Sequence, residues 1–159
     1  MNYNKNDDFL KEENRDGYIV SPLMKKVWSV ELDLLSELDR VCKKYDIKYY
    51  AAFGTLLGAV RNKGFIPWDD DIDVCMLRDD YARLKEVAKD EFSGKYYYQD
   101  WYNSCGRTWI FSKLRNSETT AIEYLDKPEE FNQGIFIDIF PIDAVSYTHL
   151  RAHETDSYL

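Results

Sequence analysis

Two segments of the chain place apolar residues three or four positions apart, which is the spacing of an amphipathic helix. The first opens with Ser21-Pro22, which suits an N-cap followed by a first helical residue, and it ends before Asp46. The second is expected to be capped by Asp79 or Asp80 and to end at Ser93-Gly94. The inner faces predicted for the two helices are Leu23, Val27, Leu34, Leu38, Val41 and Tyr45, and then Tyr81, Leu84, Val87, Ala88 and Phe92.

Short runs of aromatic and β-branched residues, separated by turn-forming residues, predict strands in the rest of the sequence. A short helix is expected at 56–61, directly after a turn at Gly54-Thr55. The predicted strands are residues 48–53, 71–77, 96–101, 109–114, 119–125 and 134–140. The length of 159 residues suits one domain with one hydrophobic core.

Both ends of the sequence lack this patterning. Residues 1–20 are polar and charged, and we expect a flexible lead-in that has no apolar signal-peptide core. Residues 146–159 show no clear period and resemble translated adapter or vector sequence, so we expect a non-native tail there. The alternative for this tail is a genuine short terminal helix. The folded domain is therefore predicted to span residues 21–145.

The charge balance narrows the expected partners. The chain carries 21 Lys and Arg against 29 Asp and Glu, a formal net charge of −8, and it has no basic run. Proteins that bind nucleic acid need Lys and Arg to replace the counterions of the phosphate backbone. We therefore expect no nucleic-acid partner, and simple electrostatic attachment to anionic lipid is also disfavoured.

The apolar runs and the cysteines bear on location. No stretch approaches 18 consecutive apolar residues, so no transmembrane helix is predicted. Cys42, Cys75 and Cys105 form no CxxC pair and accompany no His cluster, so a zinc site is unsupported. Scattered thiols of odd number are typical of a reducing compartment, and we expect a cytoplasmic protein. A peripheral membrane association and the oligomeric state are left open.

A run of acidic residues, Asp69-Asp70-Asp71-Ile72-Asp73, is framed by apolar residues. Burying like charges is unfavourable unless a cation offsets them. Because side chains alternate across a strand, Asp71 and Asp73 are expected to point the same way and to hold Mg²⁺ or Mn²⁺. Asp69 lies two positions before Asp71, so its side chain would point the same way, and we expect it to be a secondary ligand. The alternative is a solvated acidic turn, whereas an EF-hand loop is excluded because its Gly and distal Glu are missing.

A third carboxylate is expected from a later strand. Asp138 is the one charged residue in the apolar run 134–140, and a buried carboxylate there requires a partner. We predict that Asp71, Asp73 and Asp138 form a catalytic, metal-binding set. The alternative for Asp138 is an ion pair or hydrogen bond with a core Arg or a hydroxyl group.

Five further residues are candidates for binding a substrate phosphate. Gly54 and Thr55, at a strand-to-helix turn, would allow backbone N–H groups to approach a phosphate. Lys113 and Arg115 lie two positions apart on one strand face and could contact phosphate oxygens, and Arg61 lies near the turn. The alternative for Lys113 and Arg115 is a pair of exposed cations on an edge strand.

Two long motifs of this sequence resemble the LicD family of the nucleotidyltransferase superfamily, which has fukutin and fukutin-related protein as relatives. They are Gly54-Thr55-Leu56-Leu57-Gly58-Ala59-Val60-Arg61 and Gly64-Phe65-Ile66-Pro67-Trp68-Asp69-Asp70-Asp71-Ile72-Asp73. The similarity extends through 78–81, 113–115, 119–120 and 134–143, and it covers about residues 24 to 145.

The resemblance implies an α/β (α+β) fold of nucleotidyltransferase type, a small mixed, twisted sheet with flanking helices. The superfamily pattern is Gly-Ser, an acidic pair and a third acidic residue. Thr55 stands here for the Ser, Asp71 and Asp73 fit the pair, and Asp138 fits the third position. Family domains usually continue past the Phe-Pro-Ile-Asp segment, so the resemblance also implies a domain that is incomplete at its C-terminus.

The activity implied is a transfer of phosphocholine, or a related alcohol phosphate. LicD proteins are associated with moving it from CDP-choline to a cell-surface glycan such as teichoic acid or lipopolysaccharide. The expected partners are therefore a CDP-linked small-molecule donor and a glycan acceptor. Two alternatives stay open: a nucleotidyltransferase that adds NMP to a small molecule, and a non-catalytic nucleotide-binding remnant.

Overall fold

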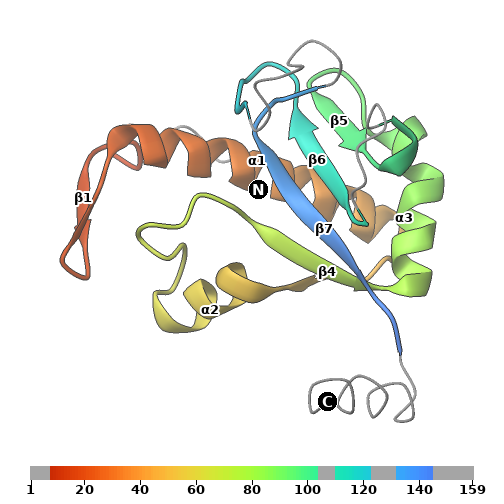
Figure 1. The fold of residues 1–159 in the computed structure, drawn as a ribbon, viewed down its shortest axis with the longest axis horizontal. Helices are drawn as coiled ribbons and strands as arrows, with labels where there is room; N and C mark the ends of the chain where they lie inside the picture. Colours follow the sequence, from red (N-terminus) through yellow and green to blue (C-terminus); the bar gives the residue numbers. More distant parts are fainter. Residues whose placement is uncertain (1–7, 104–109, 123–131, 145–159) are drawn as a thin grey trace, which may run out of the picture.

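The computed structural model describes residues 8–103, 110–122 and 132–144. The elements in these ranges are helices and short strands (Figure 1). In chain order they are β1 (Glu13–Arg15), β2 (Tyr18–Val20), α1 (Pro22–Tyr45), β3 (Tyr50–Ala51), α2 (Phe53–Arg61), β4 (Asp73–Leu77), α3 (Arg78–Glu91), β5 (Tyr96–Gln99), a 3₁₀ helix (Trp101–Asn103), β6 (Ser112–Asn116) and β7 (Phe136–Ile142).

A five-stranded sheet in the order β3-β4-β7-β6-β5 forms the centre of the fold. Strands β4 and β7 are parallel neighbours, and the other neighbouring pairs are antiparallel. Parallel neighbours require a crossover connection, and here the chain between them passes through α3, β5 and β6. The predicted α/β class with a small mixed sheet is confirmed.

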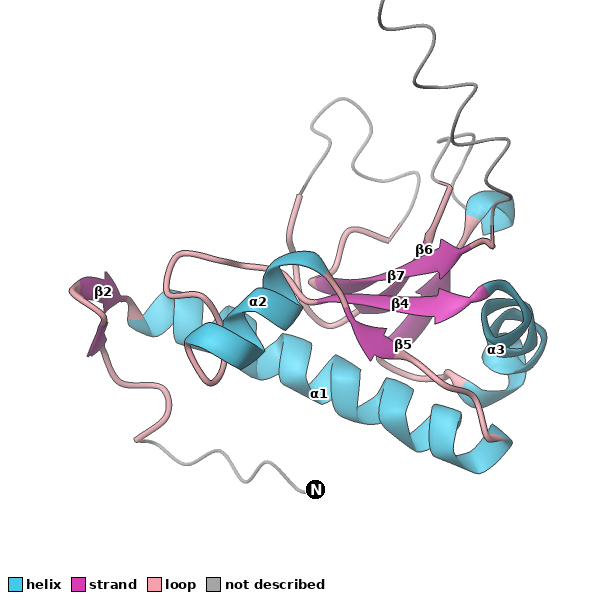
Figure 2. Cartoon of the chain, turned by 90° about the horizontal axis from the view of Figure 1, so that it is seen from below, coloured by secondary structure: helices cyan, strands magenta, loops and turns pink. Residues whose placement is uncertain are grey.

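Helices α1 and α3 cover one face of this sheet (Figure 2). Helix α1 packs against β6 and β7, and α3 packs against β4 and β7. Side chains alternate across a strand, and Val74, Met76, Ile137 and Ile139 point into this layer with at most 1% exposure. The residues between them point to the opposite face, which we call the site face.

Helix α1 begins and ends as predicted. The Ser21 hydroxyl accepts a hydrogen bond from the Met24 N–H, and Asp46 takes the left-handed conformation that ends the helix. The predicted inner face was wrong at Leu23, which is 71% exposed. The buried stripe contains two charged residues, so the spacing of apolar residues alone does not identify it. The stripe is Lys25, Trp28, Glu31, Leu34, Leu38, Val41 and Cys42.

Helix α2 begins earlier than predicted, at Phe53. Gly54 and Thr55 therefore lie in its first turn and not in a turn before it. Strand β4 begins at Asp73, so Asp71 precedes the strand in a loop. The loop that precedes β4 is thus two residues longer than the predicted strand at 71–77 implied.

Helix α3 follows β4 without a loop. Its N-cap is Leu77, and the predicted caps Asp79 and Asp80 lie in its first turn, where carboxylates favour the positive end of the helix dipole. A strand was predicted at 119–125. Residues 119–122 form no strand, and residues 123–125 lie outside the described ranges. Residues 145–159 lie outside them as well.

Residues 13–20, predicted as part of a flexible lead-in, form a two-stranded antiparallel hairpin of β1 and β2. Its last residue, Val20, is fully buried. The sequence pattern missed this hairpin because a two-stranded ribbon with three residues per strand is stabilised by packing rather than by propensity. No helix in the described ranges has the length and apolar character needed to cross a membrane.

Candidate active site

Three charged residues lie side by side on the site face. The strand register pairs Asp73 of β4 with Asp138 of β7, and Asp138 with Lys113 of β6. Residues paired in this way have neighbouring side chains on the same face of a sheet. The structure therefore brings Asp138 next to Asp73, although the two are far apart in the sequence.

Lys113 forms a buried ion pair with Asp138. Its Nζ lies 3.0 Å from Asp138 Oδ1, and the two side chains are 3% and 13% exposed. The same ammonium group lies 3.4 Å from the centre of the Phe136 ring. The alternative considered for Lys113 is thus wrong, because it is not an exposed cation on an edge strand. Asp138 forms an ion pair with a core cation, as its alternative expected, and this cation is a lysine.

Backbone contacts fix Asp73 against the start of α2. The Asp73 N–H donates to Thr55 Oγ1 at 2.8 Å, and the Ala52 N–H donates to the Asp73 carbonyl at 3.0 Å. Between them, Phe53 has a φ of 42°, a left-handed conformation that is strained for a residue with a side chain. Thr55 therefore positions the acidic strand.

The acidic loop, residues 64–72, lies very close to α2. A Cβ atom at Gly54 would lie 2.5 Å from Asp69 Oδ2, and one at Gly58 would lie 2.5 Å from the Gly64 carbonyl oxygen. A side chain at Gly54 would displace the Asp69 carboxylate, and one at Gly58 would push the loop backbone away. The two glycines of the first motif therefore allow the Asp69 carboxylate to sit against the first turn of α2.

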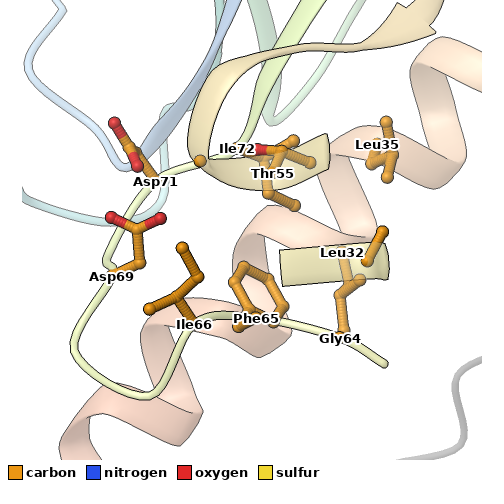
Figure 3. A pocket seen from close by; sticks show the side chains of 11 residues that line it. Leu32, Leu35, Thr55, Gly64, Phe65, Ile66, Asp69, Asp71 and Ile72 are labelled. Carbon is orange, nitrogen blue, oxygen red and sulfur yellow. The ribbon is translucent and has the colours of Figure 1, made fainter. Parts of the chain in front are cut away.

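A pocket of about 140 Å³ lies between α1, the beginning of α2 and the acidic loop (Figure 3). Its lining is mainly apolar, and its two charged residues are Asp69 and Asp71. Figure 3 shows their carboxyl groups next to each other. This volume is smaller than the roughly 300–1,000 Å³ of typical ligand pockets, so we assign no ligand to it.

The carboxylates of the site raise one another's pKa. Burial, followed by the charges of Asp71 and Asp138, raises the pKa of Asp73 to about 7. Burial and neighbouring carboxylates also raise the pKa of Asp69 and of Asp71. A hydrogen bond between these two carboxyl groups favours the proton on Asp69. The described residues thus concentrate more negative charge than they balance.

Glu31, on α1, adds a further carboxyl group that the sequence pattern did not identify. It is 1% exposed, and its Oε2 has no hydrogen-bond partner among the described residues. Burial, followed by the charges of Asp71 and Asp70, raises the pKa of Glu31 to about 9. It is therefore neutral at pH 7. Its helical spacing from Trp28 and Leu34 is the signal that could have placed it at the core.

The donor set suits a divalent cation, although no three His, Cys, Asp or Glu side chains of the described ranges are arranged to hold one. Carboxylate oxygens are the hard ligands that Mg²⁺ prefers, and the raised pKa values show an unmet need for positive charge. Mg²⁺ is commonly held by one or two carboxylates, with water and substrate phosphates completing its shell. Asp71 and Asp73 can supply such a pair.

The first turn of α2 offers backbone donors beside the carboxylates. The first N–H groups of a helix have no intrahelical acceptor, and Ala52 provides no capping side chain. These groups and the helix dipole favour an anion. Because Thr55 is tied to Asp73, an anion held here would lie next to the acidic site.

The other two predicted phosphate-binding cations donate hydrogen bonds to groups outside the acidic set. Arg61 is exposed at the other end of α2, where its Nε donates to Asn62 Oδ1 at 2.9 Å. Arg115 is fully buried and donates to Gln99 and, at 2.9 Å, to the Gly134 carbonyl. These contacts give Arg115 a structural role in joining β5, β6 and the start of β7. Lys113 is the predicted cation that the fold places beside the site.

Comparison with known proteins identifies the family. The family model for the LicD/FKTN/FKRP nucleotidyltransferase domain matches residues 46–158. The chain belongs to the LicD family. The LicD match includes every residue predicted for the site, from Gly54 to Asp138, and excludes the hairpin and α1.

Individual curated proteins are similar to segments of different length. The lipopolysaccharide cholinephosphotransferase LicD of Haemophilus influenzae is 54% identical over 56 residues, which is 35% of this chain and 21% of that protein. An uncharacterised protein of Rickettsia prowazekii is 34% identical over 130 residues, 77% of this chain and 48% of that protein. An uncharacterised protein of Rickettsia typhi is 39% identical over 54 residues, 34% of this chain and 18% of that protein. The matched segments thus span less than half of each of these relatives.

The crowding of carboxylates in this LicD site predicts a stability that depends on pH. The pKa of Asp73 is about 7 and that of Glu31 about 9 in the folded protein, both above their ordinary values. The folded state therefore binds protons more tightly than the unfolded state, and this stabilisation is present at low pH and is lost as the pH rises through about 7 and 9. We expect the free energy of unfolding without a divalent cation to fall between about pH 5 and pH 8.

Urea titrations monitored by circular dichroism at a series of pH values would measure this dependence. MgCl₂ or MnCl₂ should restore stability at the higher pH more than at the lower one, because a cation offsets charge that exists only when the carboxyl groups are ionised. NaCl at equal ionic strength is the control. A flat profile, or equal recovery by NaCl, would contradict the prediction.

Proposed function

We propose that this protein transfers phosphocholine, or a related alcohol phosphate, from a CDP-linked donor to a hydroxyl group of a cell-surface glycan such as lipopolysaccharide or teichoic acid. Membership of the LicD family and the cholinephosphotransferase of Haemophilus influenzae support this class of reaction. The observation that carries it is the Asp73-Asp138-Lys113 row beside the first turn of α2.

Each carboxylate of the site and the first turn of α2 would have a defined role. Asp71 and Asp73 would hold Mg²⁺ or Mn²⁺, with Asp69 supporting Asp71. Such an ion, when bound, would offset charge on the donor phosphates. The first-turn N–H groups at Gly54 and Thr55 would bind a phosphate oxygen and orient the donor.

The acceptor step would then be a displacement at phosphorus. The acceptor oxygen forms a bond to the phosphorus that carries the alcohol, and the bond from that phosphorus to the oxygen of CMP breaks. Asp138, held in place by its ion pair with Lys113, would accept the proton of the acceptor hydroxyl. CMP would leave with the electron pair of the broken bond.

Calorimetry with CDP-choline tests the donor class directly. We expect binding that requires Mg²⁺ or Mn²⁺ and that CMP competes for. Incubation with a purified lipopolysaccharide should then release CMP and add phosphocholine to the glycan, as followed by mass spectrometry. Binding without a cation would contradict the metal role, and release of phosphocholine with CMP attached to the acceptor would show nucleotidyl transfer instead.

A further inference from the structure

The acidic loop is held from its outer side by residues that precede the family match. Trp28 of α1 is fully buried, and its indole Nε1 donates to the Asp69 carbonyl at 2.7 Å. The indole also stacks on Phe65, with ring centres 4.6 Å apart and planes at 5°. One side chain thus contacts two points of the loop, one of them at the first carboxylate.

The β1–β2 hairpin contacts the same loop and its approach. Arg15 Nη1 donates to the Phe65 carbonyl at 3.2 Å. Tyr18 meets the Trp68 ring edge to face, with centres 5.8 Å apart. Before the loop, Asn62 Nδ2 donates to Asp16 Oδ2 at 2.8 Å. The hairpin is therefore joined to the chain between α2 and β4 at three places.

Ionic contacts fasten the hairpin to α1 in turn. Glu13 accepts hydrogen bonds from Arg15 Nε and Nη2, at 2.9 and 3.1 Å. It also forms an ion pair with the buried Lys25 of α1. The Arg15 guanidinium lies 5.2 Å from the centre of the Trp28 ring. These bonds lower the pKa of Glu13 to about 2, so Glu13 stays ionised at neutral pH.

We propose that Trp28 and the β1–β2 hairpin form a brace that positions the acidic loop, and with it Asp69 and Asp71, against the first turn of α2. Gly54 and Gly58 allow the loop to approach α2 from the inside, but small residues supply no attraction. The contacts of Trp28 and Arg15 supply it from the outside. The brace goes beyond the proposed function because it makes the placement of the proposed ligands depend on residues 13–28.

The burial of carboxyl groups explains why the loop needs a brace. Asp69 and Asp71 are half-buried and Asp73 is buried, so an unrestrained loop would move these polar side chains towards water. Hydrogen bonds to the loop backbone at Phe65 and Asp69 oppose that movement without adding charge to the site. Trp28 and Arg15 are thus positioning residues that act through the backbone of the loop.

The test compares Trp28→Phe, which keeps a ring for stacking but loses the indole N–H, with Lys26→Ala, an exposed neighbour on α1. Amide hydrogen exchange reports loop opening at Asp69, whose N–H donates to Ile66, and at Gly64, whose N–H donates to Gly58. We expect Trp28→Phe to speed exchange at both amides by about tenfold and to leave the β7 amides unchanged. Lys26→Ala should match the wild type.

Mn²⁺ binding followed by electron paramagnetic resonance gives a second readout. We expect Trp28→Phe to weaken it by about tenfold, the usual effect of removing a group that orients a metal ligand. Arg15→Met, which changes the hairpin and not the core, should act in the same direction and serves if Trp28→Phe does not fold. Loop exchange at the wild-type rate, or faster exchange spread equally over β7, would overturn the brace.

The two proposals can fail separately. If the wild-type protein binds no Mn²⁺, the metal role in the proposed function is wrong, while the exchange measurement still decides on the brace. If Mn²⁺ binds and the variants leave both readouts unchanged, the proposed function stands and the brace is rejected.

Discussion

Replacing Asp73 by Asn is expected to lower the rate of phosphocholine transfer by about 10³-fold, because the loss of a metal-binding charge at a phosphoryl-transfer site is worth several kcal/mol. The same change should raise the free energy of unfolding near neutral pH. Burial and the charges of Asp71 and Asp138 already disfavour the ionised form of Asp73, whose pKa is about 7. An amide of nearly the same shape removes that unfavourable charge.

A loss of activity together with a gain of stability separates a chemical role from misfolding. The measurements are CMP release with CDP-choline as the donor and a urea titration at the same pH. Asp70→Asn is the matched control, since Asp70 is exposed in the loop that precedes Asp73 and its replacement removes the same charge. Unchanged transfer in Asp73→Asn at saturating Mg²⁺ would contradict the metal role of Asp73. Equal losses of activity in both variants would show that the total negative charge matters, and not the position of Asp73.

Replacing Lys113 by Met is expected to destabilise the protein by about 3 kcal/mol near pH 8, because breaking a buried ion pair leaves a buried charge without its balancing partner. Lys113 and Asp138 are 3.0 Å apart and nearly buried, and Asp73 lies on the other side of Asp138. Asp138 would then face a like charge in place of a cation. The loss should shrink near pH 5, where the carboxyl groups take up protons.

A double-mutant cycle checks this assignment. Asp138→Asn together with Lys113→Met removes both charges, and the double variant should recover most of the stability lost in the single one. Urea titrations at both pH values measure the free energy of unfolding of each variant. If the two single losses simply add, the pair is not coupled and Lys113 acts through its other contacts, such as the one with Phe136.

Several local features followed from the sequence for direct physical reasons. Ser21-Pro22 and Asp46 bound α1 because a hydroxyl cap, a fixed φ and a residue that tolerates the left-handed region act within one turn. The apolar spacing of Tyr81, Leu84 and Ala88 predicted the inner face of α3 correctly. The acidic run and Asp138 were identifiable as candidates because burying a carboxylate in an apolar strand requires a partner.

Other features depended on contacts that a linear pattern does not contain. The stripe of α1 passes through Glu31, whose burial beside the acidic loop contradicts its usual preference for water. The burial of Arg115 and its hydrogen bond to Gln99 could not be read from the spacing, because they depend on the pairing of β5 with β6. The hairpin at 13–20 exists because Arg15 and Glu13 find partners on α1 and the acidic loop.

The sequence by itself determined the family, the fold class and the identity of the acidic residues, because these depend on local spacing and on motifs carried by neighbouring residues. The tertiary structure decided which residues meet. It placed Asp138 between Asp73 and Lys113, since the order of strands in a sheet is set by packing over the whole domain. It also placed Trp28 and the hairpin around the acidic loop, because these contacts join segments that are 41 and 50 positions apart in the sequence.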